Sequence, residues 1–320
     1  MDNELRPRAM RDTFLANLYE MMAKDEKVFV LSADFGAPTL DKIRNDYPQR
    51  FINVGIAEQN LIAVAAGLAL EGHKVVCYAI APFLTMRCLE QIRVNLAILS
   101  QLRPMSVTLL GVGAGMSYEV SGPTHHCIED IAILSSLPNV TVWSPSDARL
   151  SGALAQYCVG KPGINYIRCD AKPQPPLMSL DIDLVRGFRS QGQGGGLAVV
   201  STGYPTQVIH TLMAERGEAG QAMSLIDVFN INGFDEQTLA AELRDAKRII
   251  VVQESVRDGG LDTRIRRLAD DAGLSATIEV RAMTGSYHFE IGTRDALHRH
   301  YGMSRAQLAD TLFAPQSPRP

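Results

Sequence analysis

Short runs rich in apolar and β-branched residues alternate along the chain with segments in which apolar residues recur at helical spacing. In the first half the apolar runs lie at residues 27–34, 50–54, 73–80, 105–113, 139–145 and 164–168. The helical patterns lie at residues 10–24, 40–47, 56–72, 82–102, 128–137 and 147–160. Strands that alternate with helices pair in parallel, because a crossover helix is needed between parallel neighbours. The alternation therefore predicts an α/β fold.

The same alternation starts again after a break in composition near residue 171. Lys172-Pro-Gln-Pro-Pro has the composition of a linker, and a Gly-rich segment at 186–196 precedes a new apolar run at 197–203. Further strands are expected at 224–228, 248–253 and 276–280, with helices at 206–216, 236–246, from 260, and at 306–313. We therefore expect two parallel-sheet α/β domains, at 1–171 and 197–320, joined by a linker at 172–196.

Composition and charge exclude several classes of partner. The chain has 320 residues, 46% of them hydrophobic, and a net charge of −4 without a basic stripe, so no nucleic-acid or anionic-membrane contact is expected. The amino terminus lacks an apolar signal core, and no apolar run reaches the length of a membrane span, which predicts a cytoplasmic location. The five cysteines form no Cys-x-x-Cys pair, and we expect them to be reduced and mostly buried.

The stretch from Asn53 to Gly72 stands out because it is almost free of polar side chains. After a turn at Gly55 it continues as a helix rich in alanine and other small residues, with Gly72 at the expected carboxyl cap. Such a helix is expected to be buried nearly all round, in a core or an interface. Glu58 lies near its start, either as a residue favoured there by the helix dipole or as a functional acid.

Three motifs decide between these alternatives. Gly-Ile-Ala-Glu-Gln-Asn at 55–60, Ala-Pro-Phe-Leu at 81–84 and Gly-Pro-Thr-His at 122–125 resemble, in order and spacing, the pyrimidine-binding half of transketolases and deoxyxylulose-phosphate synthases. The resemblance covers nearly the whole chain. It implies a thiamine diphosphate-binding pyrimidine-type fold followed by a transketolase C-terminal-like domain, whose role in the family is mainly dimer packing. The second domain shows no motif that demands chemistry. A loop followed by a helix start explains Glu254, Asp258 and Gly259-Gly260 as well as a functional role would.

The resemblance also assigns cofactor-binding residues. Glu58 matches the glutamate that hydrogen-bonds a ring nitrogen of the aminopyrimidine and so helps the cofactor's 4′-amine to create the ylid nucleophile. Phe83 matches the aromatic residue that stacks on the pyrimidine, with an ordinary core phenylalanine as the alternative. Ile56 and Met86, which stand in or beside these motifs, are expected to contact the cofactor too, although Met86 replaces a second aromatic. Asp34 follows the end of a strand, where α/β sheets bind ligands, or is a simple turn residue.

Further positions are implied for the substrate. His125 matches a family histidine that faces the oxygens of the donor sugar and helps to move protons. Arg168 ends a strand where transketolases keep an arginine for the substrate phosphate; the alternative is an ion pair at the domain interface. Ser121 and Gly113 stand where the family has an aspartate and a histidine that touch the sugar. These departures predict a bulkier or less hydroxylated substrate, or a rebuilt site.

A motif that the family needs is missing. Transketolases hold the cofactor's diphosphate through Mg²⁺ bound by a Gly-Asp-Gly motif in a separate amino-terminal domain, and the nearest string here, Arg257-Asp-Gly-Gly, lies in the wrong domain. We therefore expect no metal ligands in this chain and a partner subunit that carries that domain.

The resemblance implies one subunit of a split transketolase, which transfers a two-carbon ketol unit from a ketose to an aldose or aldehyde. Such a subunit is expected to form the homodimer core of an α2β2 heterotetramer. The alternatives are the beta subunit of a 2-oxo-acid dehydrogenase, a deoxyxylulose-phosphate synthase-like enzyme, and a non-catalytic scaffold.

Overall fold

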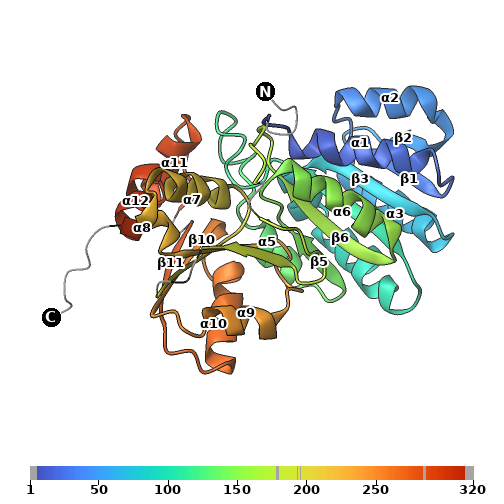
Figure 1. Cartoon of the computed structure of the whole chain (residues 1–320). Helices are drawn as coiled ribbons and strands as arrows, with labels where there is room; N and C mark the ends of the chain where they lie inside the picture. The colour runs from blue at the N-terminus through green and yellow to red at the C-terminus, as the bar shows by residue number, and fades with distance from the viewer. Residues whose placement is uncertain (1–5, 178–179, 193, 195, 284–285, 314–320) are drawn as a thin grey trace.

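Two β-sheets, each covered by helices, lie side by side in a computed structural model that describes residues 6–177, 180–192, 194, 196–283 and 286–313 (Figure 1). The first sheet has six strands in the order β2-β1-β3-β4-β6-β5, and every neighbouring pair is parallel. Its strands are β1 Val28–Ser32, β2 Phe51–Asn53, β3 Lys74–Ile80, β4 Ser106–Val112, β5 Val140–Trp143 and β6 Gly163–Cys169. The parallel α/β prediction for the first domain is thus confirmed.

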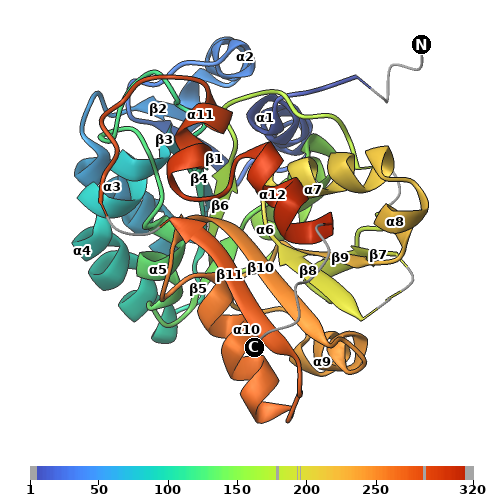
Figure 2. The ribbon, with the colours of Figure 1, turned by 90° about the vertical axis from the view of Figure 1, so that its left-hand side faces the viewer.

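Helices cover both faces of this sheet, as Figure 2 shows. One face is covered by α3 (Glu58–Leu70), α5 (Asp130–Ser135) and the segment 83–101. The other face is covered by α1 (Met10–Met22), α2 (Pro38–Asp46) and α6 (Ala148–Gly160). A sheet buried on both sides needs strands that are apolar throughout, which explains the continuous hydrophobic runs in the sequence.

The segment 82–102, expected as one long helix, is built differently. It consists of the π-helical turns η3 (Phe83–Arg87) and η4 (Ile92–Ile98), a short α4 (Leu89–Gln91) between them, and the 3₁₀ turn η5 (Leu99–Gln101). A π-turn widens the helix by accommodating an extra residue, and such turns are frequent at functional sites. Here the first one carries Phe83 and Arg87.

The second sheet has five strands in the order β11-β10-β8-β9-β7. Its strands are β7 Phe188–Gln191, β8 Leu197–Ser201, β9 Ser224–Val228, β10 Arg248–Val256 and β11 Thr277–Met283. Its helices are α7 Tyr204–Glu215, α8 Glu218–Gln221, α9 Glu236–Leu243, α10 Leu261–Asp271, α11 Arg294–His300 and α12 Arg305–Phe313. The helices α7, α11 and α12 pack on one face, and α9 and α10 pack on the other.

This second sheet differs from the prediction at one edge. Strand β7 pairs antiparallel with β9, so the sheet is mixed, whereas its other strand pairs are parallel as expected. The strand also lies inside 172–196, the segment expected to be a linker. The last part of that segment therefore belongs to the second domain. The short helices α8 and α11 were not predicted either.

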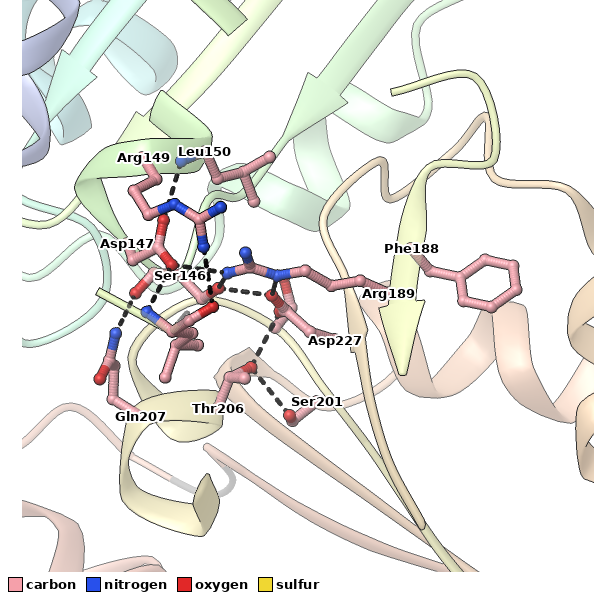
Figure 3. A network of polar contacts seen from close by, with 12 residues as sticks. Ser146, Asp147, Arg149, Leu150, Phe188, Arg189, Ser201, Thr206, Gln207 and Asp227 are labelled. Atoms are coloured by element: carbon pink, nitrogen blue, oxygen red, sulfur yellow. Dashed lines mark hydrogen bonds and ion pairs between the residues drawn. The ribbon is translucent and has the colours of Figure 1, made fainter. Parts of the chain in front are cut away.

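Strand β7 also joins the two domains through a buried arginine. Arg189 donates from Nε to Asp227 at 2.9 Å and from Nη2 to Asp147 at 3.0 Å, while its neighbour Phe188 points the opposite way into the second core (Figure 3). Asp147 caps α6 of the first domain by accepting from the backbone N–H of Leu150. The carboxylates of both domains therefore share one guanidinium.

Two further expectations concern burial. All five cysteines are free and buried, as predicted. Helix α3, by contrast, buries only one side: Leu61 and Ala65 are fully buried, whereas Ala63 and Gly67 are exposed in the single chain. In the part of the chain that the structure describes, no helix is both long enough and apolar enough to span a membrane.

Candidate active site

Glu58 is the first residue of α3 and is only 4% exposed. The turn before it is set by Gly55, whose φ of 75° favours glycine, and by Asn53, whose side-chain oxygen accepts from the Gly55 N–H. Arg87 donates to Oε2 of Glu58 at 2.6 Å. No described residue donates to the other carboxylate oxygen. One face of this buried acid is thus paired, and the other is available to a ligand.

Aromatic rings gather next to this ion pair. The Arg87 guanidinium lies over the Phe83 ring, 4.5 Å from its centroid, and the ring of His125 meets Phe83 edge-on at 5.2 Å. The ring of Tyr118 also meets His125 edge-on, with 6.2 Å between the ring centroids. The structure thus brings together Glu58, Phe83 and His125, which the three motifs predicted. Arg87 and Tyr118 are additions that no motif indicated.

The remaining predicted cofactor residues lie outside these contacts. Asp34 is an exposed residue with a φ of 54° whose carboxylate accepts from the side-chain amide of Asn53. It therefore orders the turn that leads to Glu58. The side chain of Ile56 is 78% exposed, and Met86 is half-buried on the η3 turn. A direct cofactor contact for these three residues stays a prediction.

The space left by Gly113 is filled by a tyrosine. Gly113 has a φ of 106°, and a Cβ added there would lie 2.2 Å from Cε2 of Tyr118. Ser121 is exposed, and its backbone N–H donates to the carbonyl of Tyr118. The Tyr118 ring therefore occupies the space above Gly113.

Arg168 requires a correction. Its side chain is 1% exposed, and it donates to Asp130 at 2.7 Å and to the backbone carbonyls of Cys127 and Glu254 at 2.9 and 2.7 Å. A buried guanidinium with these partners is inaccessible to a substrate phosphate. The ion pair with Asp130 lies within the first domain, and the hydrogen bond to the carbonyl of Glu254 on β10 reaches the second domain, so Arg168 contacts the domain interface without forming the ion pair across it that was the alternative.

Glu254 is the centre of a buried network that the sequence did not reveal. Arg294 of α11 donates to both carboxylate oxygens of Glu254 and also to Asp170, the latter at 2.5 Å. Nε2 of His298 lies 2.5 Å from Oε1 of Glu254. Burial raises the pKa of Glu254, but Arg294 and His298 outweigh it and hold the pKa well below its usual range. The backbone N–H of Arg294 donates to Glu119. The network thereby fastens the loop between Gly113 and His125 to the second domain.

A second histidine beside the site was also missed. His126 is 3% exposed, and its Nε2 makes no hydrogen bond to any described residue. Burial lowers the pKa of His126, so its neutral form is favoured, and His125 is the histidine of the pair that faces the aromatic cluster.

Comparison with known proteins agrees with the motifs. The chain matches the transketolase pyrimidine-binding domain over residues 6–168 and the transketolase C-terminal domain over residues 189–308. It is 30% identical over 270 residues to an apulose-4-phosphate transketolase subunit of Actinobacillus succinogenes, covering 84% of this chain and 86% of that protein. It is 26% identical to a 6-deoxy-6-sulfo-D-fructose transketolase subunit of Clostridium sp., covering 95% and 94% respectively.

A solved structure shows the same arrangement. "Split gene transketolase, inactive beta4 tetramer" superimposes with a TM-score of 0.81 at 25% identity, and the match covers 96% of this chain and 97% of that one. The pyrimidine-binding match alone spans more than half of the chain, and its three motifs converge on one cluster in the structure. The chain therefore belongs to the transketolase family, as one subunit of a split transketolase.

Proposed function

We propose that this subunit works with thiamine diphosphate and an amino-terminal, diphosphate-binding partner to transfer a two-carbon ketol unit from a ketose to an aldehyde acceptor. The observation that carries the proposal is the contact series from Glu58 through Arg87 and Phe83 to His125. It places a buried acid, an aromatic ring and a proton-transferring imidazole in one cluster. A scaffold without catalytic function would have no need of this combination.

The residues present fit the pyrimidine half of the cofactor. Glu58 has one carboxylate oxygen that no described residue contacts, and Phe83 is only half-buried, so its ring can take a stacked partner. Bound thiamine diphosphate supplies a carbon nucleophile for attack on the ketose carbonyl. Glu58 holds and exchanges a proton at the pyrimidine nitrogen, and Arg87, whose side chain is 44% exposed, keeps the carboxylate oriented.

His125 is positioned to handle protons on the sugar. Its Nδ1 lies 3.1 Å from Oγ1 of Thr124, which leaves Nε2 as the nitrogen that can exchange a proton with a substrate hydroxyl. The Tyr118 ring contacts His125, and Ser121 donates to the carbonyl of Tyr118, so we assign Tyr118 and Ser121 to the wall of the sugar channel. Because Tyr118 presents an aromatic face where the family keeps a histidine, a substrate with fewer hydroxyls suits the site better than a plain pentose phosphate.

The partner subunit is required for the other half of the cofactor. This sequence contains no Gly-Asp-Gly motif of the family, so Mg²⁺ and its ligands belong to the partner in this proposal. The exposed stripe of α3, with Ala63 and Gly67, suits close packing against a second copy of the same helix. A homodimer of this chain, flanked by two partner subunits, forms an α2β2 heterotetramer.

Calorimetry tests the proposal. We expect the isolated chain to bind thiamine diphosphate weakly and to show no turnover, whereas the mixture with its partner binds the cofactor in a Mg²⁺-dependent manner and transfers ketol units. Tight, Mg²⁺-dependent binding by the isolated chain would show that the architecture is misassigned. Binding by the mixture without any turnover would favour the scaffold.

A further inference from the structure

A cluster of metal-ligating side chains lies outside the candidate active site, where α11 meets the loop after β11. It consists of His288 and Glu290 from the loop and His300 from the last turn of α11. One ligand atom of each residue lies within 4.8 Å of the other two. The transfer chemistry proposed above uses none of these residues.

The distances in this cluster match a first-row metal site. Oε2 of Glu290 lies 3.5 Å from Nε2 of His288 and 3.3 Å from Nε2 of His300. Tetrahedral zinc with ligands at about 2.0–2.1 Å places neighbouring ligand atoms roughly 3.3 Å apart. Two imidazoles and one carboxylate suit Zn²⁺, whereas Mg²⁺ and Ca²⁺ prefer oxygen ligands alone. Three protein ligands leave the fourth position for a water molecule.

A second observation points to a ligand. Nε2 of His288 is shielded from solvent but makes no hydrogen bond to a described residue. The ring centroids of His288 and His300 lie 3.7 Å apart with an interplanar angle of 37°, and the Nε2 atoms of both rings lie beside the same oxygen of Glu290. A cation between the nitrogens and the carboxylate would give Nε2 of His288 the partner that it lacks. The His300 side chain is 43% exposed and that of Glu290 75%, so both have room to turn toward an ion.

We propose that His288, Glu290 and His300 form a Zn²⁺ site that fastens the loop after β11 to helix α11. The loop already contacts the first domain, because the hydroxyl of Tyr287 donates to Glu129 at 2.8 Å. A bound ion would fix its other side to α11, the helix whose Arg294 contacts the His125 loop through Glu119. The site is thus a structural clamp near the active site, outside the catalytic cluster.

Titration of the full-length chain without a polyhistidine tag tests this site. We expect one Zn²⁺ per chain by calorimetry, and Co²⁺ in its place should give the intense visible absorption of a tetrahedral site. His288→Gln and His300→Gln should each weaken Zn²⁺ binding by roughly 100-fold or more, because the loss of a ligand costs at least as much as the loss of a residue that only supports one. His210→Gln, which removes an imidazole elsewhere in the same domain, is the matched control.

Folding is checked by thermal melting of each variant without metal, and His300 is exposed enough for its replacement to be tolerated. Equal Zn²⁺ affinity in wild type, His288→Gln and His300→Gln would overturn the proposal. Zn²⁺ binding that does not saturate at one ion per chain would overturn it as well. Equal loss in His210→Gln would show that the ion binds elsewhere.

Discussion

At the residue scale, the buried carboxylate of Glu58 is the group on which the proposed chemistry depends most. Glu58→Gln keeps the shape of the side chain but removes its exchangeable proton and its charge. We expect folding and assembly to persist and the rate to fall roughly 10²–10⁴-fold. Proton–deuterium exchange at the cofactor's thiazolium carbon, measured in the mixture with the partner subunit, reads this step directly. An exchange rate equal to wild type would reduce Glu58 to a helix-end residue.

Gly113 gives a second prediction at this scale, because backbone and neighbour both exclude a side chain there. Gly113→Ala places a Cβ at a φ of 106° and 2.2 Å from the Tyr118 ring. The backbone alone should cost about 1–2 kcal/mol of unfolding free energy. In a Tyr118→Ala background the cost should shrink, because the clash is gone. Urea denaturation of the two single variants and the double variant measures this coupling, and strictly additive effects would contradict it.

The motifs pointed to residues that lie together in the structure where chemistry demands a particular side chain beside particular neighbours in sequence. Glu58, Phe83 and His125 meet in the structure for that reason. Tyr118 could not be found in this way, because its role depends on the space above Gly113. Arg168 was assigned to the substrate phosphate because transketolases keep an arginine at the matching strand end, yet burial against Asp130 removes its side chain from solvent. Whether one particular side chain is buried depends on the tertiary structure, so the local sequence around Arg168 could not predict it.

At the scale of elements, one buried side chain, Arg189, attaches strand β7 to the first domain. Arg189 is fully buried between Asp147 and Asp227, and its Nη2 also donates to Ser146 (Figure 3). Burial raises the pKa of Asp227, and Arg189 opposes that rise. Arg189→Ala leaves both carboxylates without this partner. We expect a loss of about 3–5 kcal/mol in the free energy of unfolding, measured by urea denaturation.

Arg189→Lys is the matched control for this strand. A lysine keeps the charge but lacks the planar fork that reaches two carboxylates, so its stability should lie between wild type and Arg189→Ala. If Arg189→Ala unfolds at the same urea concentration as wild type, the ion pairs contribute nothing to the attachment of β7.

Elements with a strong hydrophobic period were predictable, and those without one were not. The buried strands of both sheets appear in the sequence as apolar runs. Strand β7 lies between the segment 172–187 and Gly192, whose compositions are those of a linker, and its own sequence shows no apolar run. Only the pairing with β9 identifies it as a strand. The π-turns at 83–87 and 92–98 were missed because two slightly different helical periods cannot be separated over so few residues.

At the scale of the whole molecule, Glu254 links the domains through Arg294, which also contacts Asp170. Because the folded pKa of Glu254 lies below the unfolded value, its charge stabilises the fold above that unfolded value. The stabilisation declines as pH falls below the unfolded pKa and is gone once pH has passed through the lower, folded pKa. Glu254→Gln should therefore lose about 3–5 kcal/mol at neutral pH. This deficit should stay constant down to about pH 4.3, the ordinary pKa of a glutamate, and shrink below it.

Chemical denaturation of wild type and Glu254→Gln across this pH range measures the difference. A deficit that already shrinks between pH 7 and pH 5 would contradict a lowered pKa for Glu254. The network itself could not be predicted from sequence, because Glu254 and Arg294 stand 40 residues apart and Asp170 and Arg294 stand 124 apart. Nothing in the local pattern of either segment indicates the other.

The charge pairs across the domain boundary have a consequence for protein engineering. Asp147 and Asp170 of the first domain depend on Arg189 and Arg294 of the second, while Arg168 depends on a carbonyl of β10. A chimera that joins one of these domains to the counterpart from a relative would take only one partner of each charge pair from this chain. Exchange of modules between relatives is therefore expected to succeed when both domains move together, and to yield aggregated protein when the junction falls between them.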